Sequence, residues 1–235
     1  MKMLNRIRQE LKNIIFEIKS RGSEIEERVS LNVPFVCQFA LPEHAELSLK
    51  KQLNPVDDQY WANTGARSQE RYADWAFTMC GMASAAMALG YFKSETLLQP
   101  ALLAEDALQH GVYIEDEVEI SSMRYREFAT WIENYGLKAV VLSKLSIRAI
   151  QYALTQKNLV IVSVNPNIRG YDTAQVEQKG GHLVLVVGYD KNTNTISVNN
   201  PSGFTSTDTQ ISHTLPLSEF NQYFAGRGIV LSPTK

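Results

Sequence analysis

The sequence contains only two cysteines, Cys37 and Cys80, among its 235 residues. Two cysteines exclude the disulfide framework that is typical of small secreted domains, so we expect a reducing, cytoplasmic environment. A single Cys37–Cys80 disulfide stays compatible with the sequence. The four histidines and two cysteines show no Cys-x-x-Cys or His-x-x-x-His spacing. The sequence therefore predicts neither a metal site nor a bound cofactor.

Long apolar runs and a strong charge imbalance are also missing. No stretch of about 18 consecutive apolar residues occurs, and no transmembrane segment is expected. Residues 1–19 lack the apolar core and small-residue cleavage site of a signal peptide. The formal net charge is −2, which gives no electrostatic reason to expect nucleic-acid binding. The ordinary globular composition and the length suit one large domain or one domain of two lobes.

Residues 1–20 show a regular helical pattern. Apolar residues recur at steps of three and four, widened by one neighbour: Leu4, Ile7, Leu11, Ile14, Ile15 and Ile18. The other face is mostly basic, and Gly22 ends the pattern. We divide the chain into an N-terminal amphipathic helix with a linker, residues 1–30, and a main domain, residues 31–235. Three interpretations of the helix stay open: docking on its own domain, binding a partner protein or coiled coil, and lying on a membrane surface.

The main domain changes character at its middle. Residues 39–70 have weak periodicity, which predicts a long irregular segment. Helices are expected at 80–92, before His110, at 121–136 and at 147–156, with Ser94 and either Ser121 or Ser122 as caps. Strands are expected at 159–164, 182–189, 195–199 and 228–231, with a short helix at 218–224. A helical half followed by a strand half predicts an α+β fold of two lobes.

Cys80 lies at the start of a predicted helix. The positive end of a helix macrodipole favours a thiolate, so we expect a lowered pKa for this thiol. Gly81 is expected to leave room for a substrate backbone beside the sulfur. The alternative is a buried, unreactive cysteine, which is a common role for this residue type.

His182 opens an apolar strand directly after two glycines, and Asn200 follows 18 positions later. A strand, a turn and a returning strand span that gap, which places the Asn200 amide beside the His182 ring. An amide oxygen there accepts an imidazole N–H and fixes the ring's orientation and tautomer. Asn199 points to the opposite side of the strand and is the weaker candidate. Gln38, with the Cys80 backbone N–H, is a candidate donor to an oxyanion.

Four segments together resemble the double-glycine (bacteriocin-leader) peptidase-like family of the papain fold. They are Val-Pro-Phe-Val-Cys-Gln at 33–38, Met-Cys-Gly-Met-Ala at 79–83, Gly-His-Leu-Val-Leu-Val-Val-Gly-Tyr-Asp at 181–190, and Val-Asn-Asn-Pro-Ser-Gly at 198–203. The resemblance covers residues 31–231 and implies a papain-like fold, with Gln38 as oxyanion donor, Cys80 as nucleophile and His182 as base. That family usually has Asp where this chain has Asn200, whereas papain itself uses Asn. The gap between Gln38 and Cys80 is longer than is usual in the family.

These residues predict a cysteine peptidase that hydrolyses a peptide or amide bond through an acyl-enzyme. Two alternatives stay open: an acyltransferase or peptide cyclase that uses the same site, and a catalytically silent binding module of the same fold. The partners expected are a peptide or amide substrate and a protein bound through the N-terminal helix. Tyr60, Trp61 and Arg67 are candidates for lining the substrate groove between the lobes.

Overall fold

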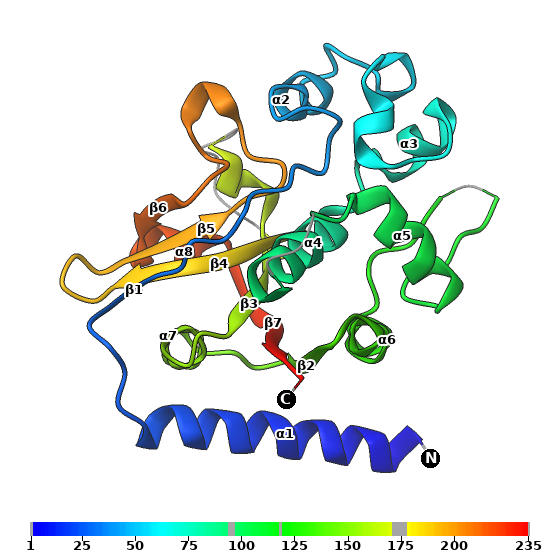
Figure 1. The fold of residues 1–235 in the computed structure, drawn as a ribbon. Coiled ribbons are helices and arrows are strands. Elements are labelled where there is room, and N and C mark those ends of the chain that lie inside the picture. The colour runs from blue at the N-terminus through cyan, green and yellow to red at the C-terminus, as the bar shows by residue number, and fades with distance from the viewer. Residues whose placement is uncertain (1, 94–96, 118, 171–177, 235) are drawn as a thin grey trace.

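Most of the second half of the chain forms one antiparallel sheet, whose strands differ in length (Figure 1). The computed structural model describes residues 2–93, 97–117, 119–170 and 178–234. The strands are β1 (Arg28–Ser30), β2 (Leu137–Leu142), β3 (Leu159–Val164), β4 (His182–Asp190), β5 (Thr195–Asn199), β6 (His213–Pro216) and β7 (Phe224–Pro233). Their order is β2-β7-β3-β4-β5-β6, and β1 also pairs with β4. Strand β1 therefore joins the sheet from within the segment that the sequence assigned to the linker.

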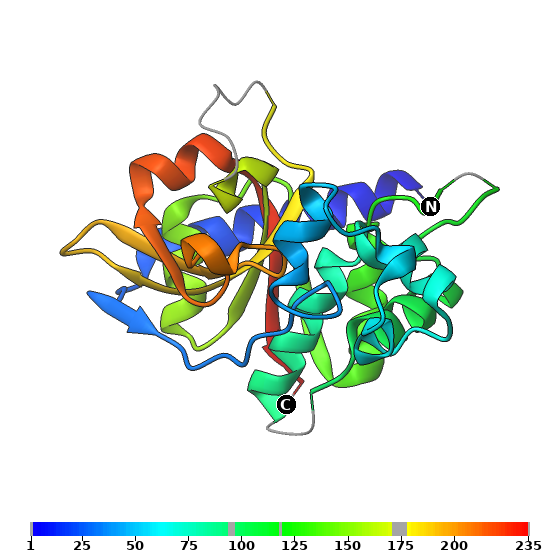
Figure 2. The same ribbon diagram turned by 90° about the horizontal axis from the view of Figure 1, so that it is seen from above.

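The helices form a second lobe beside the sheet and also cover the sheet's faces (Figure 2). They are α1 (Lys2–Gly22), α2 (His44–Leu49), α3 (Gln69–Ala76), α4 (Cys80–Lys93), α5 (Pro100–Gln109), α6 (Tyr125–Trp131), α7 (Ile147–Thr155) and α8 (Leu217–Tyr223). Helix α4 packs against β4 and joins the two lobes. Its small and apolar residues from Gly81 to Leu89 are all buried, which explains why it shows no polar face. The α+β, two-lobe architecture expected from the sequence is confirmed.

Membrane spans are not found among the single helices that the structure describes. None of these helices is both long and apolar enough to cross a bilayer. The pair α3 and α4, bent by 94° between its members, meets the two criteria only when taken together.

Local signals placed some helix ends correctly and others wrongly. Ser146 caps α7, because its Oγ accepts the Ala149 N–H at 3.1 Å. The expectation that Ser121 or Ser122 caps α6 is wrong, since that helix starts after Arg124. Ser121 Oγ instead accepts the Ile114 N–H at 2.8 Å and closes a loop. The proposed cap at Ser94 lies outside the described residues.

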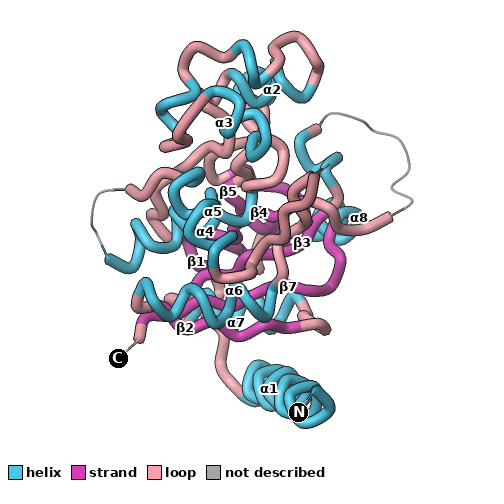
Figure 3. Tube along the Cα trace, turned by 90° about the vertical axis from the view of Figure 1, so that its right-hand side faces the viewer, coloured by secondary structure: helices cyan, strands magenta, loops and turns pink. Residues whose placement is uncertain are grey.

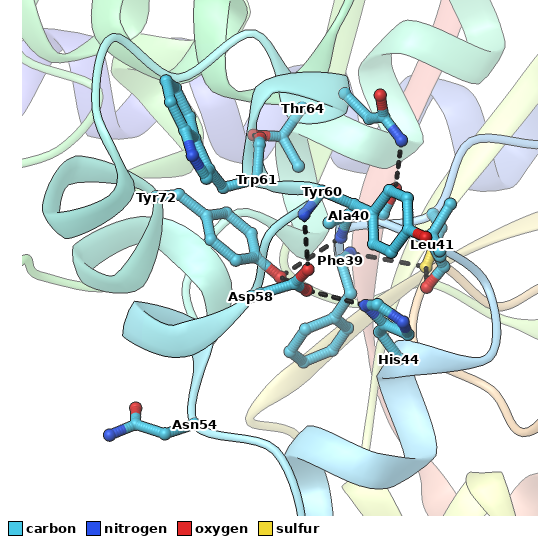
Figure 4. Close-up of polar contacts among 12 residues, drawn as sticks. Phe39, Ala40, Leu41, His44, Asn54, Asp58, Tyr60, Trp61, Thr64 and Tyr72 are labelled. Carbon is cyan, nitrogen blue, oxygen red and sulfur yellow. Dashed lines mark hydrogen bonds and ion pairs between the residues drawn. The ribbon is translucent and has the colours of Figure 1, made fainter.

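Residues 39–70 are more ordered than their composition indicates. They contain α2 and two short 3₁₀ helices, Pro55–Asp57 and Trp61–Thr64. The fully buried Asp58 side chain holds them together, because it contacts His44 Nδ1 at 2.7 Å and accepts the Tyr60 N–H at 2.9 Å (Figure 4). Tyr72 OH lies 3.5 Å from the same carboxylate and accepts the Ala40 N–H at 3.2 Å. This cluster fixes the segment that connects Gln38 to the helices before Cys80.

Helix α1 lies along the outside of the main body, next to α7 and β2 (Figure 3). It docks through an unexpected face. Asn13 Nδ2 donates to Ser143 Oγ at 2.9 Å, Glu17 accepts the Ser146 N–H at 3.0 Å, and Phe16 packs edge-on against Tyr152. The apolar stripe stays 51–63% exposed at Leu11, Ile14, Ile15 and Ile18. The Leu4 and Ile7 side chains lie outside the described residues.

Deleting residues 1–22 is expected to leave the main domain folded and Cys80 reactive, because the described part of the apolar stripe, from Leu11 to Ile18, is exposed and lies outside the core. The alkylation rate of Cys80 should stay within about twofold, while lost contacts at Ser146 and Tyr152 lower the free energy of unfolding by about 1–3 kcal/mol. Alkylation kinetics and urea unfolding measure both. The matched control is full-length Ile14→Ser/Ile18→Ser, which keeps the docked face and should keep the stability. An unfolded truncated protein would contradict this prediction.

Candidate active site

Cys80 and His182 line the same cavity, which has a volume of about 340 Å³ and lies between the two lobes. The helical lobe contributes Phe77, Thr78, Cys80, Ile120, Ser122, Met123 and Tyr125. The sheet lobe contributes Ser163, Gly181, His182, Leu183 and Arg227. Tyr60, Trp61 and Arg67 do not line this cavity. No cluster of three or more side chains suited to hold a metal occurs in the described part of the chain.

Cys80 is the first residue of α4, as the sequence predicted. The backbone N–H groups of Leu183 and Gly81 favour the thiolate form of this sulfur, which lies near the start of β4. The expectation that Gly81 makes room for substrate is wrong. A Cβ at Gly81 would lie 2.5 Å from Met123 Sδ and 3.1 Å from Leu183 Cδ1. The missing side chain therefore allows the lobes to pack closely, and a substrate does not occupy that space.

Burial changes the protonation states expected for this pair. Desolvation raises the pKa of Cys80 and outweighs both the N–H groups and the cation of Arg169. Desolvation and the same Arg169 cation lower the pKa of His182, and the Asn200 hydrogen bond opposes them only in part. The expectation of a lowered Cys80 pKa is therefore wrong. At neutral pH the resting pair is a thiol and a neutral imidazole.

The pH dependence of alkylation follows from these directions. In a Cys37→Ser background, the iodoacetamide rate at Cys80 should rise with pH through a pKa above the ordinary thiol value of about 8.5. Arg169→Gln removes a cation that favours the thiolate, and should slow the reaction at pH 7 by roughly three- to tenfold. Stopped mixtures analysed by mass spectrometry give both rates. A rate that stays high and flat down to about pH 5 would indicate a thiolate–imidazolium pair and contradict the prediction.

The His182 ring is held in one tautomer. Its Nε2 lies 2.8 Å from Asn200 Oδ1, and both side chains are buried. The Ser202 N–H also donates to Asn200 Oδ1, at 3.2 Å, and so fixes which end of the amide faces the ring. An oxygen there accepts, so Nε2 must carry the proton. The Nδ1 atom is then left with a lone pair that can act as a base.

Asn199 faces away from this ring, as the two-residue period of a strand predicts. Its Oδ1 accepts the Ser212 N–H at 2.8 Å and its Nδ2 reaches Val33 O at 3.4 Å. The β4–β5 hairpin pairs Leu185 with Asn199, which carries the next residue back toward the start of β4. The predicted hydrogen bond between His182 and Asn200 is therefore present, whereas the catalytic roles of both residues stay predictions.

Two neighbours of the imidazole were missed from the sequence. Ser202 Oγ lies 3.2 Å from His182 Nε2 and accepts a hydrogen bond from Arg169 Nε at 2.8 Å. Burial lowers the pKa of Arg169 to about 10, so this side chain is still a cation at neutral pH. Ser202 was within reach, because it shares the turn of Asn200. Arg169 ends the short 3₁₀ helix Pro166–Arg169 that follows β3, and nothing local marks it.

Gln38 is buried close to the site but does not line the cavity. Its backbone N–H donates to Pro201 O at 2.9 Å, and its Nε2 donates to Ala76 O at 2.8 Å. Cys37 Sγ contacts the same Pro201 oxygen at 3.3 Å, and burial raises the Cys37 pKa to about 12. Both cysteines are free thiols. Gln38 thus ties the end of α3 to the Asn200 turn, and its role as an oxyanion donor stays a prediction.

Comparisons with known proteins agree with this architecture. A C39-like peptidase structure from Bacillus anthracis is 19% identical, with a TM-score of 0.52, over 89% of this chain and 100% of that one. A double glycine motif protease of an AMS/PCAT transporter, solved with its leader peptide, is also 19% identical, with a TM-score of 0.42, over 67% and 86%. No curated protein gave a significant match. The model of the Peptidase_C39 like family matches residues 30–229, so this chain belongs to that family.

Proposed function

We propose that the chain is a cysteine peptidase that hydrolyses a peptide or amide bond through a Cys80 acyl-enzyme. The observation that carries the proposal is the His182 tautomer. The His182 Nε2–H group donates a hydrogen bond to Asn200 Oδ1, so Nδ1 keeps a free lone pair. The ring lines the same cavity as the Cys80 thiol. A base of fixed orientation beside a nucleophile is the arrangement that covalent acyl transfer needs.

The chemistry starts from the neutral pair. As Cys80 Sγ forms a bond to the substrate carbonyl carbon, His182 Nδ1 takes the thiol proton, because neither a free thiolate nor an imidazolium is favoured beforehand. The protonated ring then donates to the leaving amine nitrogen while the C–N bond breaks. Water attacks the resulting thioester and loses a proton to His182, which frees the thiol and a carboxylic acid.

Two features favour the charged species along this path. Asn200 Oδ1 accepts a hydrogen bond from the Nε2–H group throughout the reaction and keeps the ring in place as it becomes an imidazolium. The N-terminus of α4 and the nearby Arg169 favour negative charge near the sulfur and the carbonyl oxygen. We propose that the Cys80 backbone N–H and the Gln38 side-chain amide donate hydrogen bonds to the oxyanion. For this, Gln38 Nε2 has to leave its present acceptor, Ala76 O.

We further propose that residues 31–235, together with the paired strand β1, form the catalytic domain, and that the rest of residues 1–30, with α1, is accessory. The exposed apolar stripe of α1 supports a role in binding a partner protein. A reducing compartment, the cytoplasm, suits a mechanism that requires a free Cys80 thiol.

Mass spectrometry after incubation with a peptide library in H₂¹⁸O tests the proposed function. An acyl adduct on Cys80, together with products that carry ¹⁸O at a new carboxyl group, supports hydrolysis. Products joined to an amine without ¹⁸O would assign the same site to acyl transfer. A folded protein that gives neither adduct nor product would contradict both.

A further inference from the structure

The cavity beside Cys80 carries positive charge. Among the described residues that line it, Arg227 is the one charged side chain, and none of them is a carboxylate. Arg169 adds a second cation, which acts on both Cys80 and His182 from the side of Ser202. A substrate group that enters this space therefore meets a positive potential next to the nucleophile.

A β-bulge directs Arg227 toward the cavity. The pairing of β7 with β3 shifts register between Val162 and Val164, whose partners on β7 are Gly228 and Phe224. Residues 225–227 therefore form an extra loop opposite Ser163, and Gly226 adopts a φ of +67° within it. Bulges near active sites re-aim side chains in this way.

Gly180 makes room for the guanidinium. Its φ is +104°, and a Cβ at this position would lie 2.5 Å from Arg227 Nη2 and 3.1 Å from Ser163 Oγ. The first glycine of the Gly-Gly-His motif thus leaves space that Arg227 and the Ser163 hydroxyl both border. Any side chain at position 180 would push the guanidinium away from Ser163 or distort the approach to His182.

Among the residues that the structure describes, no acidic side chain explains the placement of Arg227. Arg71 bonds to Glu105 and Glu115, and Arg124 pairs with Glu127. Within the described ranges, Arg227 has no ion pair of this kind, although it lies near the buried Ser163 and borders the cavity. Its donors are therefore free for a ligand.

We propose that Arg227 and Ser163 form a carboxylate-binding subsite, so that the peptide substrate carries a carboxylate close to the bond that Cys80 attacks. The proposal rests on the function proposed above for Cys80. A guanidinium binds a carboxylate through two parallel N–H donors, and the serine hydroxyl supplies a third. The carboxylate can belong to an acidic side chain or to a chain terminus. Because Arg227 is exposed, we expect a preference of roughly three- to thirtyfold in kcat/KM.

Two small reagents test the anion site without any peptide. Iodoacetate and iodoacetamide alkylate the same thiol and differ in one negative charge, and a Cys37→Ser background leaves only Cys80. The ratio of the iodoacetate rate to the iodoacetamide rate should fall roughly three- to tenfold in Arg227→Gln and recover in Arg227→Lys. The matched control, Arg126→Gln, loses the same charge outside the cavity and should keep the ratio. An unchanged ratio in Arg227→Gln would overturn the proposal.

Peptide pairs then identify the source of the carboxylate. Peptides that the wild type cleaves are resynthesised with Glu or Gln, and with a free or an amidated C-terminus. A preference for Glu alone assigns a side chain, and a preference for the free terminus alone assigns a chain end; either should disappear in Arg227→Gln. Turnover without any preference overturns the subsite and leaves the proposed function intact. If the ratio of the iodoacetate rate to the iodoacetamide rate depends on Arg227 but no peptide is turned over, the proposed function is overturned and the anion-binding site is retained.

Discussion

Replacing Cys80 by alanine is expected to reduce peptide turnover to background, a loss of at least about 10⁴-fold in kcat/KM. The sulfur is the atom that forms the acyl-enzyme, and an alanine methyl group offers no electron pair for this step. The fold should survive, because position 80 starts a helix rich in alanine and the change removes a single atom. Chromatography of cleaved peptide measures the loss, and circular dichroism with urea unfolding measures the fold.

Cys37→Ser is the matched control for that loss. Cys37 lies outside the cavity, and its thiol contacts Pro201 O and stays protonated, since burial raises its pKa to about 12. A serine hydroxyl can donate to the same carbonyl, so most of the activity should remain. Turnover by Cys80→Ala at a rate near that of the wild type would remove Cys80 from the mechanism. Faster alkylation of Cys37 than of Cys80 would do the same.

Local patterns were sufficient for much of the sheet and for one contact in the site. The apolar, β-branched run at 159–164 is β3 with the predicted ends, because a fully buried strand needs apolar residues on both faces. The contact between His182 and Asn200 followed from the length of a hairpin and the alternation of its faces. Both inferences need only residues that are close in sequence.

Long-range packing decided what the sequence could not predict. Arg169 and Arg227 reach the site from a short 3₁₀ helix and a bulge whose positions depend on the sheet pairing. The helix dipole at Cys80 was identified correctly, but its effect on the thiol is smaller than that of burial, which only the packed lobes define. Helical periodicity likewise located the apolar stripe of α1 without indicating that it faces solvent.

The second large effect concerns the neighbouring asparagines, which form a matched pair. Asn199 and Asn200 are both buried, and each accepts one backbone N–H, from Ser212 and Ser202 respectively. Alanine at either position therefore removes the acceptor of one backbone N–H, that of the buried Ser202 or that of the exposed Ser212, and should lower the free energy of unfolding by roughly 1–3 kcal/mol. Only Asn200 also contacts the His182 ring. The difference in rate between the two variants thus isolates the orientation of the base.

Asn200→Ala is expected to lower kcat/KM by roughly ten- to a few-hundredfold, and Asn199→Ala by less than about threefold, with both proteins folded. Asn200→Asp should keep activity, because a carboxylate oxygen accepts the same hydrogen bond from the His182 Nε2–H group. That carboxylate also favours the imidazolium and raises the pKa of His182. Since the base must be neutral, the acid limb of the pH–rate profile should move to higher pH in this variant alone. Steady-state kinetics from pH 4 to 9 on the three variants measures both effects. A larger defect in Asn199→Ala, or an unshifted profile in Asn200→Asp, would show that the Asn200 hydrogen bond does not orient the catalytic base.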